Sequence, residues 1–255
     1  MNDHHGEFHI ETHDIWAAAS LLTRLPVPVN HERAGQRGAD AAWAFPLVGT
    51  LLGLVAGLVA FCLGAIGLPS GMPELFALAA LAMMTGGLHE DGLADCADGF
   101  WGAMDAKKRL EIMKDSRIGA YGTLALVFAV MLTWLGLLEI GSERFILIMI
   151  GICAISRLPM VLAMYSLPNA RTSGMAARAG VPSRLSVAIA TTLCVALAIA
   201  IFGWLGLPIL VFVILATLPL FIMALRKLGG QTGDVLGASQ QIGMIAAIVA
   251  IILLT

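Results

Sequence analysis

Residues 86–102 concentrate carboxylates between glycines and apolar residues, a pattern that favours metal chemistry. In the string GGLHEDGLADCADGFWG, Asp91, Asp95 and Asp98 are spaced by four and then three residues. On a helix this spacing places the three carboxylates on one face, where mutual repulsion would raise their pKa values unless a cation lay among them. Carboxylate oxygens beside phosphate groups favour Mg²⁺ over zinc. The string therefore predicts a magnesium site of these three acids, with His89 next to it.

A second string, KKRLEIMKDSRIGAYG at 107–122, precedes an apolar run and combines cations with an acid. The positive flanking that is usual beside a membrane helix explains its first three residues, but it explains D-S-R-I-G-A-Y-G poorly. We expect Lys114 and Arg117 to bind phosphate oxygens. We expect Asp115 to add a further ligand to the metal site.

A third string, GGQTGDVLGASQQ at 229–241, is a glycine-rich turn directly before the last apolar run. Glycine-rich turns at helix starts expose backbone N–H groups that bind phosphate. Gly230, Thr232 and Asp234 are therefore candidate phosphate-binding residues. The signal is weak alone, and it gains weight if the turn lies on the same face of the membrane as the acids.

Two arginines complete the candidate site. Arg157 lies inside an apolar run, where a charge usually faces the bundle interior or a polar cavity, and Arg171 follows in the loop string PNARTSG. We expect both to contact anions. A pocket of acids, arginines and glycine turns suits metal-assisted phosphoryl transfer. Because no covalent nucleophile stands out, we expect direct displacement by a substrate hydroxyl, with His89, Asp91 or Asp95 as general base.

The elements that must position these residues are membrane helices. Of the 255 residues, 59% are hydrophobic and 13% are charged, whereas an average soluble domain has about 25% charged residues. Too few polar side chains remain to cover a soluble globule. The formal net charge of −2 provides no field that would recruit nucleic acid. The sequence therefore predicts an all-α, polytopic membrane helix bundle and excludes soluble, disordered and nucleic-acid-binding classes.

We expect one integral membrane domain over 1–255, with about seven spans, because a span needs about 20 mostly apolar residues. Residues 1–42 form a polar N-terminal segment, in which 14–25 should be an amphipathic helix at the interface. The bundle occupies 43–255, and Leu207 and Pro208 should form a tight hairpin. The expected spans are 43–66, 73–89, 120–140, 144–165, 185–206, 208–225 and 239–255.

The distribution of Lys and Arg predicts the orientation of the protein in the membrane, and the spacing of three glycines predicts how one helix packs. With these spans, all of the 15 Lys and Arg residues except Arg144 and Arg157 fall on one side. The positive-inside rule then places the N-terminus and the three strings in the cytosol. Gly49, Gly53 and Gly57 recur every four residues, so we expect close packing on another helix of the same chain.

The three strings also carry a resemblance to a known family. H-E-D-G-L-A-D-C-A-D-G at 89–99, R-L-E-I-M-K-D-S-R-I-G-A-Y-G at 109–122 and G-G-Q-T-G-D-V-L-G-A at 229–238 resemble the cobalamin synthase family, adenosylcobinamide-GDP ribazoletransferase. L-T-R-L-P-V-P at 22–28 and F-P-L-V-G at 45–49 extend the resemblance over nearly the whole chain. Glu90 stands where the family often has an apolar residue, so Glu90 is not expected among the metal ligands.

The resemblance implies transfer of the phospho-cobinamide moiety of adenosylcobinamide-GDP to α-ribazole or its 5′-phosphate. GMP leaves and adenosylcobalamin or its 5′-phosphate forms, with Mg²⁺ present, in the last steps of nucleotide-loop assembly. It also implies a bacterial inner membrane, with the corrinoid nucleotide and α-ribazole substrates drawn from the cytosol. The preferred acceptor, self-association and contacts with other cobalamin-assembly enzymes stay open.

Two other classes fit parts of the pattern. One is another intramembrane magnesium-dependent transferase, but the D-G-x-x-A-R string of CDP-alcohol phosphotransferases and the N-D-x-x-D type of string of prenyltransferases are missing. The other is a cation-coupled transporter, which would more often bury its acids near the middle of the membrane. Acids at the cytoplasmic edge beside an arginine-bearing loop favour phosphate chemistry instead.

Overall fold

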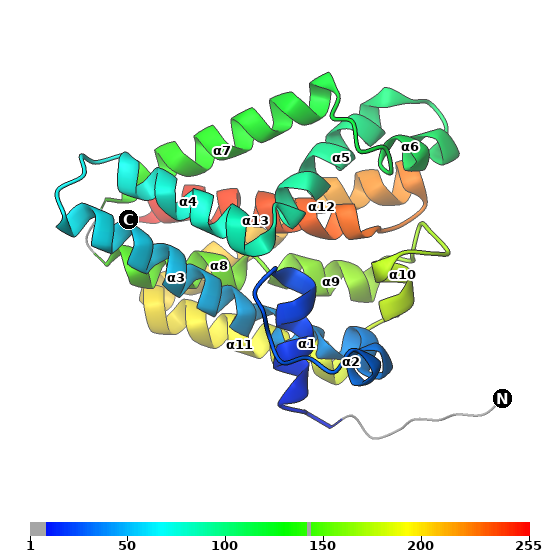
Figure 1. The fold of residues 1–255 in the computed structure, drawn as a ribbon, viewed down its shortest axis with the longest axis horizontal. Coiled ribbons are helices and arrows are strands. Elements are labelled where there is room, and N and C mark those ends of the chain that lie inside the picture. Colours follow the sequence, from blue (N-terminus) through cyan, green and yellow to red (C-terminus); the bar gives the residue numbers. More distant parts are fainter. Residues whose placement is uncertain (1–8, 142–143) are drawn as a thin grey trace.

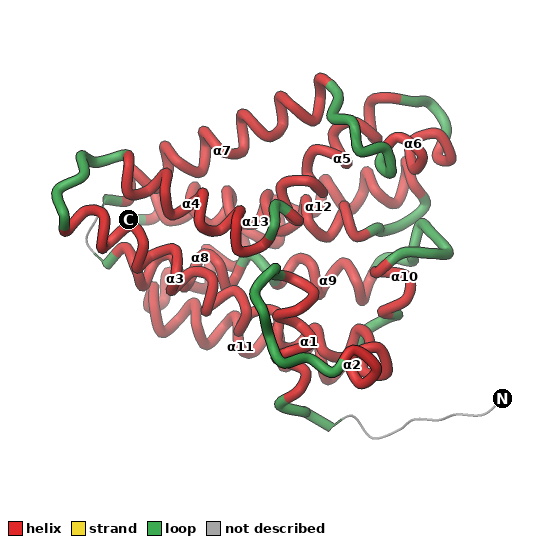
Figure 2. Tube along the Cα trace, in the orientation of Figure 1, coloured by secondary structure: helices red, strands yellow, loops and turns green. Residues whose placement is uncertain are grey.

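The computed structural model describes residues 9–141 and 144–255, and this part of the chain is built of helices without a β-strand. The all-α expectation is therefore confirmed (Figures 1 and 2). The helices in chain order are α1 (His13–Leu22), α2 (His31–Arg37), the 3₁₀ helix η1 (Gly38–Ala44), α3 (Phe45–Ala65), α4 (Met72–Thr85), α5 (Leu88–Gly102), α6 (Ala106–Ile112), α7 (Ala120–Ile140), α8 (Phe145–Ile155), α9 (Leu158–Ser166), α10 (Met175–Ala179), α11 (Arg184–Phe202), the 3₁₀ helix η2 (Gly203–Leu205), α12 (Gly206–Leu228) and α13 (Gly233–Leu254).

Several helical stretches have the length and apolar composition of membrane spans. In the described residues five qualify: His31–Ala65, Ala120–Ile140, Phe145–Ser166, Arg184–Leu228 and Gly233–Leu254. The 45-residue stretch Arg184–Leu228 contains both α11 and α12, and α4 is a shorter apolar helix. The chain is thus a multi-pass membrane protein, while the count of seven spans stays a prediction.

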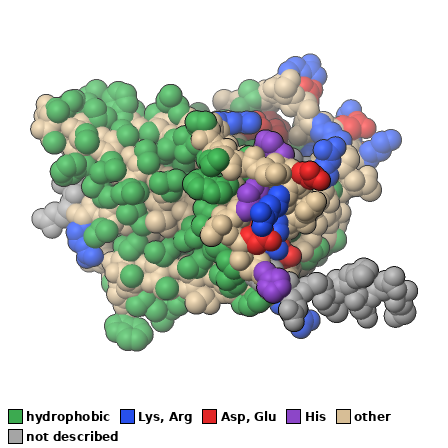
Figure 3. All heavy atoms as spheres, turned by 60° about the horizontal axis from the view of Figure 1, so that its bottom comes forward, with side chains coloured by type: hydrophobic (Ala, Val, Ile, Leu, Met, Phe, Trp, Pro, Cys, Tyr) green, Lys and Arg blue, Asp and Glu red, His purple; other side chains and the backbone are tan. Residues whose placement is uncertain are grey.

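The two ends of the bundle differ in polarity. The helices α2, α6 and α10 and the turn between α12 and α13 lie at one end, on the right in Figure 1, and the C-terminus lies toward the other. Charged side chains gather mainly at that right-hand end, whereas hydrophobic side chains cover most of the remaining visible surface (Figure 3). We call the end with α2, α6 and α10 the polar end. The three strings of the candidate site therefore share one end of the bundle.

The second expected span, 73–89, was predicted to end too late in the chain. Helix α4 stops at Thr85, and Gly86 and Gly87 follow with φ of +66° and +69°. This left-handed conformation suits glycine and terminates helices. A separate helix, α5, begins at Leu88, so the acids lie on a helix of their own rather than on a continuation of α4.

The expected hairpin is present, but its turn lies earlier in the chain. Residues Gly203–Leu205 form the turn η2, and α12 begins at Gly206. Pro208 therefore lies in the first turn of α12, where its missing N–H group leaves no intrahelical hydrogen bond unmade. The last helix also begins earlier than expected, at Gly233 rather than at 239.

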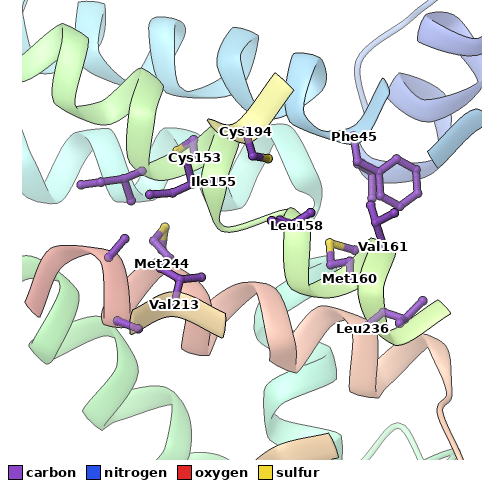
Figure 4. Close-up of a cluster of buried hydrophobic side chains, with 14 of the residues drawn as sticks. Phe45, Cys153, Ile155, Leu158, Met160, Val161, Cys194, Val213, Leu236 and Met244 are labelled. Atoms are coloured by element: carbon purple, nitrogen blue, oxygen red, sulfur yellow. The ribbon is translucent and has the colours of Figure 1, made fainter. Parts of the chain in front are cut away.

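The buried core surrounds the α8–α9 pair. In Figure 4, Ile155 and Leu158 flank the break between α8 and α9, and Val213 and Met244 approach from α12 and α13. The glycines of α3 pack closely on α8: added Cβ atoms would collide with the backbone of Cys153 at Gly49, of Met149 at Gly53 and of Ile146 at Gly57. The expectation of packing within the chain is confirmed.

This packing predicts that Gly53→Ala destabilises the protein. A Cβ atom there would lie 2.7 Å from the carbonyl carbon of Met149, and overpacking of this kind costs about 1–3 kcal/mol. Gly64 lies on the same helix, and a Cβ atom there would meet nothing within 4 Å. Thermal unfolding in detergent should therefore show a lower midpoint for Gly53→Ala but not for Gly64→Ala. Equal midpoints for the two variants would contradict the packing.

Candidate active site

Two helices bring the acids together at the polar end. Helix α5 packs on α13 through glycines: a Cβ atom on Gly92 would lie 2.7 Å from the carbonyl oxygen of Asp234, and one on Gly237 would lie 3.1 Å from that of Leu88. Small residues permit this approach of the two backbones. The close packing places Asp234, at the start of α13, near Asp91 and Asp95 on α5.

The pKa of Asp95 reflects this proximity. The pKa of Asp95 is raised to about 7, first by burial and then by the negative charges of Asp234 and Asp91. Crowded carboxylates raise one another's pKa when no cation offsets their charge. Asp91 is exposed and Asp95 is half-buried, so both carboxylates are accessible at the end of the bundle.

Asp98, in contrast, accepts hydrogen bonds from the neighbouring helix α7. Its Oδ2 accepts a hydrogen bond from the N–H of Gly119 at 2.7 Å, and its Oδ1 accepts one from the N–H of Gly122 at 2.9 Å. These N–H groups stand at the start of α7, where a helix has unpaired donors. The carboxylate of Asp98 therefore caps α7, and its place in the metal site stays a prediction.

Asp115 also lies outside the group of acids. It forms an ion pair with Arg117 at 2.6 Å, with side-chain exposures of 38% and 87%. The hydrogen bonds from Arg117 lower the pKa of Asp115 to about 2. Within residues 9–141 and 144–255, no three His, Cys, Asp or Glu side chains form a group that could hold a metal ion by themselves. The four-acid metal site is thus not assembled, and Lys114 and Arg117, both exposed, remain predicted phosphate contacts.

Arg171 and Asp234 form the ion pair of the site. Their side chains meet at 3.2 Å and are only 17% and 20% exposed. Arg171 also donates to the carbonyl oxygen of Leu110 at 3.3 Å, and its buried Nε has no hydrogen-bond partner. The hydroxyl of Thr232 donates to Asp234 and accepts from the N–H of Val235, which caps α13. Arg171 therefore has donor capacity left beside the acids.

The loop of Arg171 is held to the glycine-rich turn by a short backbone bridge. The N–H of Gln231 donates to the carbonyl oxygen of Pro168 at 2.8 Å, and the N–H of Ala170 donates to that of Gln231 at 2.9 Å. At Gly230 a Cβ atom would collide with the backbone of Pro168. Close packing therefore requires glycine at position 230. The sequence pattern did not predict the backbone bridge between the two loops.

Arg157 lies in the interior, behind the acids. It is 2% exposed and donates from its guanidinium to the carbonyl oxygen of Cys153 and to the Ser156 hydroxyl. The side chain of Gln240 also donates to Ser156, at 3.1 Å. The interior position agrees with the sequence, but these contacts are with protein groups.

Glu90 is hydrogen-bonded to the same group of interior polar side chains, although no role was expected for it. Gln241 donates from Nε2 to Glu90 at 3.0 Å and to the amide oxygen of Gln240 at 3.2 Å. Hydrogen bonds thus link α5 to α13 and onward to the α8–α9 junction. Gln240 and Gln241 lie inside an otherwise apolar helix, and this position was the signal in the sequence for buried polar contacts.

A cavity of about 100 Å³ opens beside the acids. His89 lines it, is 1% exposed and has no hydrogen-bond partner at Nε2. Burial first, and the positive charge of Arg157 second, lower the pKa of His89 to about 3, so its imidazole is neutral at pH 7. The other lining residues are Leu21, Leu22, Phe45, Leu88, Asp91, Met160, Met164, Ala176, Ala179, Gly233, Asp234, Leu236 and Gly237. We call this space the acidic cavity.

Comparison with known proteins agrees with the strings. The family described as Cobalamin-5-phosphate synthase matches residues 14–252. The adenosylcobinamide-GDP ribazoletransferase of Bradyrhizobium diazoefficiens is 42% identical over 236 residues, 91% of this chain and 90% of that protein. The proteins of the same name from Sinorhizobium medicae and Brucella canis are each 40% identical, over 94% of this chain and 96% of theirs. No solved structure matches the chain.

Proposed function

Because the chain belongs to the cobalamin-5-phosphate synthase family, we propose that the protein transfers the phospho-cobinamide moiety of adenosylcobinamide-GDP to α-ribazole or its 5′-phosphate. The reaction would take place at the acidic cavity. The observation that carries the proposal is that Asp91 and Asp234 line one cavity, with Asp95 close enough for both charges to raise its pKa and Arg171 paired with Asp234. Phosphoryl transfer from a nucleoside diphosphate ester needs carboxylates that hold a cation and an arginine that binds phosphate oxygens.

We propose Asp91 and Asp95 as the carboxylates that hold Mg²⁺. The crowding of negative charge that raises the pKa of Asp95 is relieved by a cation. Among the residues that the structure describes, protein side chains alone do not complete a metal site, which fits an ion that usually binds through one or two carboxylates plus substrate phosphates. When bound, Mg²⁺ would neutralise charge on the diphosphate oxygens.

The remaining residues would position the reactants. The unpartnered Nε of Arg171 would donate to a diphosphate oxygen, and Asp234 would hold the guanidinium in place through their ion pair. The ribose hydroxyl of the acceptor would attack the phosphorus that carries the cobinamide, and the hydroxyl proton would pass to solvent water. The phosphorus–oxygen bond to GMP breaks, and GMP leaves.

His89 would orient the attacking hydroxyl. Its imidazole is neutral, and Nε2 is free to accept a hydrogen bond. A pKa of about 3 makes His89 a weak base, but in a loose phosphoryl-transfer transition state positioning matters more than early proton removal. Burial first, and the positive charge of Arg157 second, keep the imidazole unprotonated.

We also propose that the polar end faces the cytosol of a bacterial inner membrane. The supporting observation is the gathering of charged side chains at that end and of hydrophobic ones over the rest of the visible surface (Figure 3). Lys and Arg collect in cytoplasmic loops. Both large, charged substrates would then reach the acidic cavity from the cytosol.

The test is GMP release by purified protein in detergent or lipid. Adenosylcobinamide-GDP is supplied with α-ribazole or its 5′-phosphate, and each component and Mg²⁺ are omitted in turn. Release that needs both substrates and the metal is the expected result. Well-folded protein that releases no GMP with either acceptor would overturn the proposal.

A further inference from the structure

A cavity of about 730 Å³ lies where α7, α8, α11, α12 and α13 meet. Thr255, the last residue, is part of its lining, so it lies toward the end of the bundle that is opposite to the polar end (Figure 1). Its volume is within the range of about 300–1,000 Å³ that is usual for small-molecule sites. We call it the distal cavity. The residues that line it are Glu139, Ile140, Arg144, Leu147, Ile148, Ile199, Ala200, Ile201, Phe202, Gly203, Leu205, Ile209, Ile251, Ile252 and Thr255.

The walls of the distal cavity are mainly apolar and reach the outer surface of the bundle. Ile148, Ile209 and Ile252 contribute apolar side chains from three different helices. Leu147 and Leu205 also line the cavity, and they are 43% and 38% exposed. Around a bundle of membrane spans, the neighbouring molecules are lipids. The distal cavity is therefore accessible to a lipid from the membrane.

Two opposite charges line this apolar cavity without pairing. Glu139 lies near the end of α7 and Arg144 directly before α8, and both are exposed. Within residues 9–141 and 144–255, neither side chain forms an ion pair, with the other or with a third residue. The guanidinium of Arg144 donates to the carbonyl oxygen of Ile201 at 3.3 Å, which connects the start of α8 to the end of α11. A guanidinium has five N–H donors, so Arg144 has donors left for a ligand.

A cation at this end of the bundle is unusual. Charged side chains gather mainly at the polar end (Figure 3), and Lys and Arg are generally collected in the loops of one membrane side. Arg144 is the one Lys or Arg residue that lines the distal cavity. Its free N–H groups suit an anion, and the carboxylate of Glu139 suits a cation. A single ligand that satisfies both side chains carries both charges.

We propose that the distal cavity binds a zwitterionic phospholipid whose headgroup carries a primary ammonium group. Arg144 binds the lipid phosphate through charge-assisted hydrogen bonds, which are often bidentate for arginine. Glu139 accepts a hydrogen bond from the ammonium group, and the apolar walls pack against the acyl chains next to the headgroup. A primary ammonium has N–H donors, whereas a quaternary ammonium has none. Glu139 therefore selects an ethanolamine headgroup over a choline headgroup.

The test titrates delipidated protein in detergent with phosphatidylethanolamine, phosphatidylcholine or phosphatidylglycerol of identical acyl chains, and native mass spectrometry gives each Kd. Wild type should bind phosphatidylethanolamine about 10-fold more tightly than the other two lipids, which is the effect of one charge-assisted hydrogen bond. Arg144→Gln should weaken the binding of all three lipids about 10-fold. Glu139→Gln should weaken the binding of phosphatidylethanolamine alone.

The matched controls are Arg226→Gln and Glu111→Gln. Both residues are exposed and neither lines the distal cavity: Arg226 lies in the last turn of α12, and Glu111 lies on α6. Both variants should keep the wild-type Kd for each lipid within about twofold, as is usual for exposed charges. Inorganic phosphate should not displace phosphatidylethanolamine, because it offers nothing to Glu139 or to the apolar walls.

Three results would overturn the lipid site. They are equal Kd values of wild type for the three lipids, a Glu139→Gln variant that keeps the wild-type preference, and displacement of the lipid by inorganic phosphate. If Arg144→Gln does not fold, Glu139→Gln decides alone, because it leaves the contact between Arg144 and Ile201 in place. The measurement does not use GMP release, so its failure would leave the proposed function standing.

Discussion

Asp95→Asn should lower the rate of GMP release by about 10³-fold, because a metal ligand contributes several kcal/mol to phosphoryl transfer and about 1.4 kcal/mol corresponds to a tenfold change. Asp95 is half-buried beside Asp91 and Asp234, whose charges raise its pKa to about 7. The amide removes the charge that would hold Mg²⁺ but keeps the shape of the side chain. Asp91→Asn should act in the same direction.

The matched control for Asp95→Asn is Glu111→Gln. Glu111 lies on α6, is 52% exposed and pairs with Lys108 at 3.2 Å. This substitution also converts an acid to an amide but leaves the acidic cavity intact, so turnover should stay within about twofold of wild type, as is usual for exposed pairs. Initial rates of GMP release at saturating substrates give the comparison. Full turnover by Asp95→Asn would rule out its role in the metal site.

Asp98→Ala should destabilise the protein by about 2–4 kcal/mol, because two backbone N–H groups at the start of α7 would lose a charged acceptor. Asp98 is 9% exposed and accepts from Gly119 and Gly122. Asp98→Asn keeps one acceptor oxygen and should be intermediate. Thermal unfolding in detergent, followed by circular dichroism, measures both variants.

The control for Asp98 is Asp105→Ala. Asp105 caps α6 at an exposed position, accepting from the N–H of Lys108 at 2.9 Å, and its loss should cost about 1 kcal/mol or less. The comparison also separates the two roles considered for Asp98. An Asp98→Asn variant as stable as wild type but without activity would favour metal binding over capping of α7.

Helical spacing predicted one part of the site and missed another. The four-residue interval of Asp91 and Asp95 placed them together, because both lie on one helix and the period of a helix is fixed. Asp98 follows three residues after Asp95 on the same helix but binds the start of α7, since the unpaired N–H groups there need an acceptor. That demand comes from a neighbouring helix and is not visible in the spacing of the acids.

Contacts between distant segments were the least predictable. The sequence assigned Asp234 to phosphate binding in a glycine-rich turn, whereas the structure pairs it with Arg171 and brings it beside α5. Gly92 and Gly237 permit that approach, but two glycines do not indicate which helices will meet. The membrane class was predictable from composition because few polar side chains are available to cover a soluble surface.

Binding of Mn²⁺ as a probe for Mg²⁺ tests the central claim most directly, because it reads the metal site without catalysis. Electron paramagnetic resonance would count the Mn²⁺ retained by wild type, Asp91→Asn, Asp95→Asn and Glu111→Gln, each with adenosylcobinamide-GDP present. About one ion per chain in wild type and Glu111→Gln is expected from the proposed site, with loss in both aspartate variants. Equal retention by all four proteins would contradict the assignment of the metal to Asp91 and Asp95.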